Sequence, residues 1–247
     1  MLPSITLFGV SIDLYKACYV LGFLTIFVFN FFYAKKFKIK PSKGTMITIV
    51  SFLLIYVWAF VLSWVESLFS DWGHHNAVRV YIWMPLLLFG LSKLLKEDWK
   101  KLCDFIAPAA CLVYAIARLG CIFAGCCYGY EWSWGIYSVE ADRICFPVQL
   151  CESLTAFVLA ALCIILNHKK KYVCDSRTYF IMLIPYGLSR FIWEFFADND
   201  KVLWNISSLA LHALLMTVVG VIMLIALHIA DKKKATKPSA VNQESTD

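Results

Sequence analysis

Charged residues are scarce in this 247-residue chain: Asp, Glu, Lys and Arg together make up 16% of it, and apolar residues make up 61%. An ordinary soluble domain contains roughly 45–50% apolar residues, so a soluble fold of this size could not hide so much apolar surface. The same composition excludes a disordered chain, a collagen and a coiled coil. A mean hydropathy of +0.70 therefore predicts an all-α polytopic membrane protein.

Long apolar runs without charge define the clearest membrane spans. A transmembrane helix needs about 20 apolar residues. Residues 17–34 and 45–65 reach that length without a charge, and residues 202–230 form a longer apolar segment. Ionisable residues interrupt four further apolar segments, so we expect about seven spans. These four are residues 79–92, 105–130, 146–167 and 178–196.

Basic residues are scarce in every second connection between these segments. Most of the 23 Lys and Arg residues follow the first, third, fifth and seventh expected spans. The positive-inside rule places those connections in the cytoplasm, which predicts an N-terminus outside and a C-terminus inside. The net charge of +6 thus reflects cytoplasmic lysines and does not indicate nucleic acid.

We expect one membrane domain at residues 1–230 and a disordered polar cytoplasmic tail at residues 231–247. The first ten residues contain no Lys or Arg. A cleaved signal peptide has a basic start, so we expect none here.

The basic residues outside the cytoplasmic set are mostly arginines in the expected outer half. A guanidinium group binds phosphate with two parallel hydrogen bonds, and ionisable residues inside spans are functional candidates. Glu194 follows Arg190 by four residues and shares its helix face. Ion pairing between helices and snorkelling to the interface remain alternatives. The outer set is Lys16, Arg79, Arg118, Arg143, Arg190 and Lys201.

Two polar residues begin another expected helix. Gln149 and Glu152 lie three residues apart, within five residues of Pro147, and share one helix face. A carboxylate at this place can stabilise the start of a helix through the helix dipole. It can equally belong to the same polar site as the arginines.

A glycine-rich break follows Arg118 at the expected outer end of its span. Gly120, Gly125 and Gly129 punctuate this segment. The G-x-x-x-G spacing of the last two favours close packing of membrane helices. Backbone N–H groups freed by a broken helix can instead bind an anion such as a lipid headgroup.

No C-x-x-C spacing occurs among the ten cysteines and no His flanks them, so we expect no metal site and no cofactor. Several cysteines lie toward the expected outer face, where disulfides or a thiol redox role are possible functions. A bond between the adjacent Cys126 and Cys127 would be strained. The outer cysteines are Cys121, Cys126, Cys127, Cys145 and Cys151.

Three motifs occur in order along the chain. RLGCIFAGCCYG begins at Arg118, PVQLCE at Pro147 and YGLSRFIWEFF at Tyr186. They resemble R-x-G-x-x-x-N-G-E-x-x-G, H-P-x-Q-L-Y-E and Y-G-x-x-R-F-x-x-E-F-F of the bacterial prolipoprotein diacylglyceryl transferases. YKACYVLGF, from Tyr15, is similar to that family's first helix. The resemblance implies a multi-pass protein of the bacterial plasma membrane.

The family moves a diacylglyceryl group from phosphatidylglycerol to the thiol of a lipobox cysteine. By resemblance, Arg118 and Arg190 hold the lipid phosphate and stabilise the charge on the departing glycerol phosphate. Glu152 and Glu194 would support them. Phosphatidylglycerol, or another anionic phospholipid, and prolipoprotein signal peptides are the implied partners. The implied lipid-binding residues are Tyr19, Gly120, Gly125, Gly129, Gln149 and Arg143.

The chain departs from the family pattern at several positions. Ala124 and Cys126 replace the Asn and Glu of the signature, and Phe146 replaces the His before the proline. The family's catalytic His on the third span would fall near residues 81–85, which read YIWMP.

The acceptor thiol must be activated, because a free thiol titrates near pH 8.5. The candidate bases are His74 and His75 in the outer loop, and the candidate thiolates are Cys126 and Cys127. An altered paralogue that binds an anionic lipid as an accessory protein, or that uses another acceptor, is the alternative. A thiol redox protein or a transporter is a further one.

Overall fold

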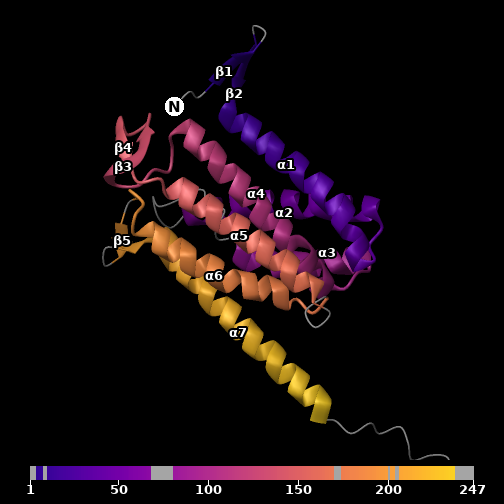
Figure 1. Ribbon diagram of the computed structural model, residues 1–247. Coiled ribbons are helices and arrows are strands. Elements are labelled where there is room, and N and C mark those ends of the chain that lie inside the picture. The colour runs from indigo at the N-terminus through magenta and orange to yellow at the C-terminus, as the bar shows by residue number, and fades with distance from the viewer. Residues whose placement is uncertain are drawn as a thin grey trace, which may run out of the picture.

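The computed structural model describes residues 4–7, 10–67, 80–169, 174–199, 201–203 and 206–236. These residues form seven α-helices and three short antiparallel strand pairs (Figure 1). The helices are α1 (Leu14–Tyr33), α2 (Pro41–Ser67), α3 (Val80–Leu95), α4 (Trp99–Ala124), α5 (Val148–His168), α6 (Arg177–Glu194) and α7 (Ser208–Thr236). The strand pairs are β1 (Ser4–Leu7) with β2 (Val10–Asp13), β3 (Glu131–Ser138) with β4 (Arg143–Cys145) and β5 (Lys201–Leu203) with β6 (Ile206–Ser207).

Helix α4 lies at the centre of the fold. Its buried residues are small or apolar for most of its length, so α1, α3, α5 and α6 can pack against it. Figure 1 shows α4, α5 and α6 side by side, with α7 against α6. The core contains Phe105 and Ile106 of α4, Met84 of α3 and Tyr179 of α6.

Among the residues that the structure describes, five helices are long and apolar enough to cross a membrane: α1, α2, α4, α5 and α7. Helix α3 is apolar but shorter, and the 18 residues of α6 include Arg177, Arg190 and Glu194. Large apolar side chains are exposed on the outer surfaces, among them Phe60 and Val158. The chain is therefore an all-α polytopic membrane protein, as its composition predicts.

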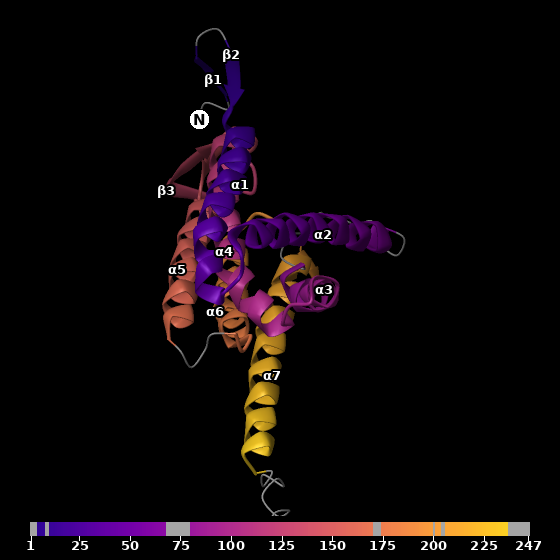
Figure 2. The ribbon, with the colours of Figure 1, turned by 90° about the vertical axis from the view of Figure 1, so that its right-hand side faces the viewer.

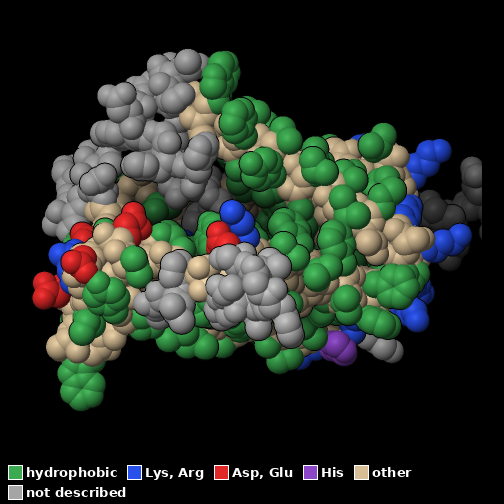
Figure 3. Space-filling view, turned by 90° about the horizontal axis from the view of Figure 1, so that it is seen from above, with side chains coloured by type: hydrophobic (Ala, Val, Ile, Leu, Met, Phe, Trp, Pro, Cys, Tyr) green, Lys and Arg blue, Asp and Glu red, His purple; other side chains and the backbone are tan. Residues whose placement is uncertain are grey.

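Charge is distributed unevenly over the molecule. Figure 3 shows most of the visible Lys and Arg toward one end of the molecule and most of the visible Asp and Glu near the other, with hydrophobic side chains between them. Figure 2 shows α2 and α3 running across the direction of α1. The number of helices that cross the membrane, expected to be seven, is not tested by this arrangement and stays a prediction. The same holds for the expected position of the N-terminus outside the cell.

Two expected helix ends differ from the structure. Helix α4 ends at Ala124 because Gly125 adopts a left-handed conformation, with φ of 74°. The segment after it leads into β3, so Gly125 and Gly129 do not form a helical packing motif as their spacing suggested. Helix α7 continues to Thr236, into the expected tail, and residues 237–247 lie outside the described residues.

Candidate active site

Glu152 occupies the centre of a buried ionic cluster. It lies on the second turn of α5, and its side chain is only 2% exposed. Arg118 Nε of α4 lies 2.5 Å from its Oε2, and Arg190 Nη1 of α6 contacts its Oε1. Both carboxylate oxygens are therefore engaged by guanidinium groups from two other helices. No side-chain hydrogen bond caps the start of α5, and the dipole role that the position of Glu152 allowed stays an alternative.

Glu194 holds Arg190 from the other side. Arg190 Nη2 lies 2.9 Å from Glu194 Oε2, as the spacing of four residues on one helix face predicts. Glu194 Oε1 accepts hydrogen bonds from Asn199 Nδ2 at 2.6 Å and from Ser207 Oγ at 2.7 Å. The loop after α6 and strand β6, directly before α7, thus fix this carboxylate. Two cations and two carboxylates form a neutral group, which makes burial tolerable.

The cluster retains unused hydrogen-bonding capacity. Among the described residues, Arg190 Nε is buried without a hydrogen-bond partner. The Arg118 side chain is 15% exposed, so it can meet a ligand from outside. A guanidinium group offers five donors in a planar fork that matches phosphate oxygens. An anion such as a phosphate can therefore bind to a pair of arginines that is already held in place.

A group of tyrosines that sequence reasoning missed surrounds the arginines. The Tyr114 hydroxyl accepts a 2.9 Å hydrogen bond from Arg118 Nε and donates one of 3.1 Å to Glu152. Its position four residues before Arg118 on one helix was the available signal. The Tyr186 ring packs against Tyr114 and Tyr81, with centroids 5.3 and 4.9 Å away.

Tyr81 lies at the start of the segment in which the family's histidine was expected. Its hydroxyl donates a 3.1 Å hydrogen bond to the carbonyl of Ala110. A tyrosine hydroxyl is neutral at neutral pH, so it does not take a proton from a thiol. The described part of α3 therefore places a hydrogen-bonding aromatic residue, rather than a base, beside the cluster.

The glycines and Gln149 shape the backbone beside the cluster. Gln149 Nε2 donates a 2.6 Å hydrogen bond to the carbonyl of Cys126. A Cβ at Gly120 would meet Cys18 of α1 at 3.1 Å, and one at Gly129 would lie 2.4 Å from the carbonyl oxygen of Phe196. These glycines allow close approach of neighbouring elements.

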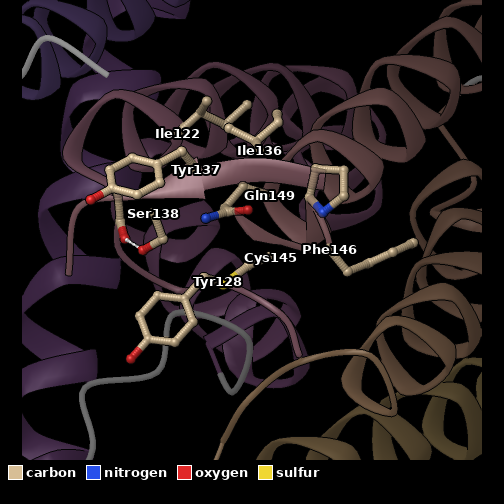
Figure 4. A pocket seen from close by; sticks show the side chains of 10 residues that line it. Ile122, Tyr128, Ile136, Tyr137, Ser138, Cys145, Phe146 and Gln149 are labelled. Carbon is tan, nitrogen blue, oxygen red and sulfur yellow. Dashed lines mark hydrogen bonds between the residues drawn. The ribbon is translucent and has the colours of Figure 1, made fainter. Parts of the chain in front are cut away.

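A small pocket lies between the β3–β4 hairpin and the start of α5 (Figure 4). Gln149 points into it, and Ser138 Oγ closes one side by donating a 2.6 Å hydrogen bond to the carbonyl of Gly125. Neither Arg118 nor Arg190 lines this pocket. It therefore adjoins the ionic cluster without containing it.

Three cysteines meet at the end of α4. The Sγ atoms of Cys121, Cys126 and Cys127 all lie within 4.8 Å of one another. Cys121 is buried, Cys126 is half-buried and Cys127 is exposed. Hydrogen bonds from the other two thiols, together with the Arg118 guanidinium, lower the pKa of the Cys127 thiol.

The other expected site residues lie farther from the ionic cluster. The Tyr19 hydroxyl of α1 accepts a 3.2 Å hydrogen bond from Tyr15 and interacts electrostatically with Arg118. Arg143 pairs with Asp198 at 2.6 Å and ties the hairpin to the loop after α6. His74 and His75 lie outside the described residues.

Comparison with known proteins agrees with the motifs. A family model for prolipoprotein diacylglyceryl transferase matches residues 3–226. The phosphatidylglycerol–prolipoprotein diacylglyceryl transferase 2 of Clostridium perfringens is 26% identical over 213 residues, which are 80% of this chain and 82% of the relative. The phosphatidylglycerol–prolipoprotein diacylglyceryl transferase of Campylobacter lari is 24% identical over 225 residues, which are 78% of this chain and 80% of the relative. The phosphatidylglycerol–prolipoprotein diacylglyceryl transferase of Clostridium tetani is 28% identical over 124 residues, which are 47% of this chain and 48% of the relative. The chain therefore belongs to the prolipoprotein diacylglyceryl transferase family, a family of transferases, as its motifs predict.

Proposed function

We propose that this protein transfers a diacylglyceryl group from phosphatidylglycerol to the thiol of a lipobox cysteine, at the outer face of a bacterial plasma membrane. One observation carries the proposal: Arg118 and Arg190 converge on the buried carboxylate of Glu152. The names of the bacterial relatives support the choice of lipid and acceptor.

In the proposed reaction, the acceptor thiol loses its proton to solvent, and its sulfur attacks the glyceryl carbon next to the phosphate. A C–S bond forms, the C–O bond to the phosphate breaks, and glycerol phosphate leaves with the bonding electrons. Negative charge grows on the departing phosphate, where Arg118 and Arg190 donate hydrogen bonds. Glu152 and Glu194 hold the guanidinium groups in place before the lipid arrives, so little reorganisation is needed during the reaction.

A second function is favoured by the segment at residues 81–85. It contains Tyr81 where the family's base is expected, and no histidine. An accessory protein that binds an anionic phospholipid without reacting would need the arginines and no base. The two functions differ in one measurable product, the thioether on the acceptor peptide.

The deciding experiment is complementation of a bacterium depleted of its own transferase. We expect the wild-type chain to restore growth, and mass spectrometry to find diacylglyceryl on the lipoprotein cysteine. Arg118→Lys and Arg190→Lys should restore growth much less well than wild type, because Lys keeps the charge and loses the planar fork. Arg177→Lys, at the opposite end of α6, is the matched control and should complement fully. Phosphatidylglycerol binding without any modified lipoprotein would establish the accessory function instead.

A further inference from the structure

The three thiols at the end of α4 are spaced for one soft metal ion. A zinc ion binds thiolates at roughly 2.3 Å in tetrahedral geometry, which sets neighbouring sulfurs about 3.8 Å apart. The Sγ atoms of Cys121, Cys126 and Cys127 already lie within 4.8 Å of one another. A contraction of the loop by about 1 Å would therefore bring all three to bonding distance of zinc.

The fold creates this spacing from a sequence that lacks C-x-x-C. The left-handed Gly125 reverses the chain directly after α4, so Cys126 and Cys127 return over the last turn that carries Cys121. Cys127 is itself left-handed, with φ of 57°. The hydrogen bond from Gln149 to the Cys126 carbonyl ties the loop to α5.

We propose that Cys121, Cys126 and Cys127 bind a zinc ion that keeps one coordination position open for the thiol of the acceptor peptide. The proposal rests on the proposed transferase function and supplies the activating group that residues 81–85 lack. It replaces the expectation of no metal that the absence of C-x-x-C suggested.

The donor set and the surroundings favour zinc with an open position. Three protein ligands and a free fourth position are the pattern of catalytic zinc sites, whereas structural sites are closed. Sulfur ligands exclude magnesium and calcium, which prefer oxygen. The exposure of Cys127 leaves a path to the ion for an acceptor. The guanidinium of Arg118, which interacts with Cys127 and Cys121, balances part of the excess negative charge of a thiolate-rich zinc site.

Zinc would supply the chemistry of thiol activation, because a thiol that coordinates a cation is deprotonated. The acceptor S–H proton leaves to solvent when the sulfur binds. The sulfur then forms its C–S bond to the glyceryl carbon, and the C–O electrons leave with glycerol phosphate. Nothing is oxidised or reduced. Arg118 links the two halves of the site, since it pairs with Glu152 and interacts electrostatically with Cys127.

Metal binding is tested on the purified full-length chain in detergent. The chain is stripped with a chelator and then titrated with zinc, and in parallel with cobalt, whose thiolate complexes absorb in the near ultraviolet. We expect about one metal ion per wild-type chain. The double variant Cys126→Ser/Cys127→Ser should bind none, whereas Cys174→Ser, at the other end of the bundle, should bind as wild type does. Both variants are checked for an unchanged thermal midpoint.

Acceptor binding is read from the same cobalt spectrum. A lipobox peptide with its cysteine should shift the cobalt bands as a fourth thiolate joins, and the same peptide with serine should not. Chelation should lower diacylglyceryl transfer at least about tenfold, and zinc should restore it.

The outcomes separate this inference from the proposed function. Transfer that persists unchanged after complete chelation, or a wild-type chain that binds no more zinc than the double variant, would overturn the zinc site and leave the transferase function standing. Binding of zinc and a cobalt response to the cysteine peptide support the site even if no transfer occurs. If zinc and the peptide bind but no transfer occurs, only the proposed transferase function is overturned.

Discussion

Two carboxylates are buried at opposite ends of the helix bundle, and their partners differ. Glu152 lies between the guanidinium groups of Arg118 and Arg190. Asp104, near the start of α4, accepts hydrogen bonds from the backbone N–H groups of Asp175, Ser176 and Tyr179, at 3.0, 2.9 and 3.3 Å.

This difference distinguishes a carboxylate with a structural role from a carboxylate that belongs to a binding site. Asp104 is satisfied by backbone groups that cannot move without disturbing α6, so it fixes the entry of that helix. Glu152 is satisfied by side chains that keep further donors, including the unpartnered Arg190 Nε. Those donors can bind an additional anion. In this protein, a buried charged residue thus indicates a binding site only where its partners keep hydrogen-bond donors that are not yet used.

The largest effect is expected from Glu152→Gln. The amide cannot balance two buried guanidinium groups, and breaking a buried pair costs about 3–5 kcal/mol. We expect a marked drop of the thermal midpoint and no detectable transfer. Glu140→Gln, in the exposed turn between β3 and β4, is the control. A stable and active Glu152→Gln protein would remove Glu152 from the centre of the site.

Arg118→Lys and Arg190→Lys should each lower transfer by about one to two decades. Each substitution loses charge-assisted hydrogen bonds worth about 1.5–3 kcal/mol while the charge remains. Initial rates on phosphatidylglycerol vesicles, with Arg177→Lys in parallel, measure the effect. Lysine variants as fast as wild type would mean that the arginines only balance the carboxylates.

Asp104→Asn should lower the stability of the fold without changing the rate of diacylglyceryl transfer. The amide keeps one acceptor oxygen and presents an NH₂ group toward backbone donors, at a cost of about 1–3 kcal/mol. We expect a lower unfolding midpoint and an unchanged rate per folded molecule. A slower rate at an unchanged midpoint would show that the two ends of the bundle are coupled.

Arg143→Ala should have the smallest effect. Arg143 pairs with Asp198 at the surface, and exposed ion pairs contribute little to stability. If the residue only ties the hairpin to the loop after α6, transfer should stay within about twofold of wild type. A clear rise in the apparent KM for phosphatidylglycerol would instead support the lipid-binding role expected from the sequence.

Sequence alone identified the polar residues of the ionic cluster. Arg118, Glu152, Arg190 and Glu194 could be singled out because charges are rare in apolar segments and expensive there. The spacing of Arg190 and Glu194 also predicted their pairing, since helix geometry places residues four apart on one face. Tyr114 was accessible to the same argument.

The convergence of α4, α5 and α6 on the carboxylate of Glu152 could not be derived from residue spacing. Nothing in the spacing of Arg118, Glu152 and Arg190 says that they share one carboxylate, because contacts between helices depend on how the helices pack. The role of Asp104 was hidden for the same reason, as its partners follow it by about seventy residues along the chain.

The membrane class, the helical segments and the rare buried charges were determined by the sequence, because hydropathy and helix periodicity are local properties of the chain. The tertiary structure decided the rest. It turned the loop after Gly125 so that Cys126 and Cys127 meet Cys121, and it set Arg118 beside them. The physical reason is that a left-handed glycine reverses the chain locally, whereas contacts with distant residues, such as Ser138 and Gln149, fix where the reversed chain lies.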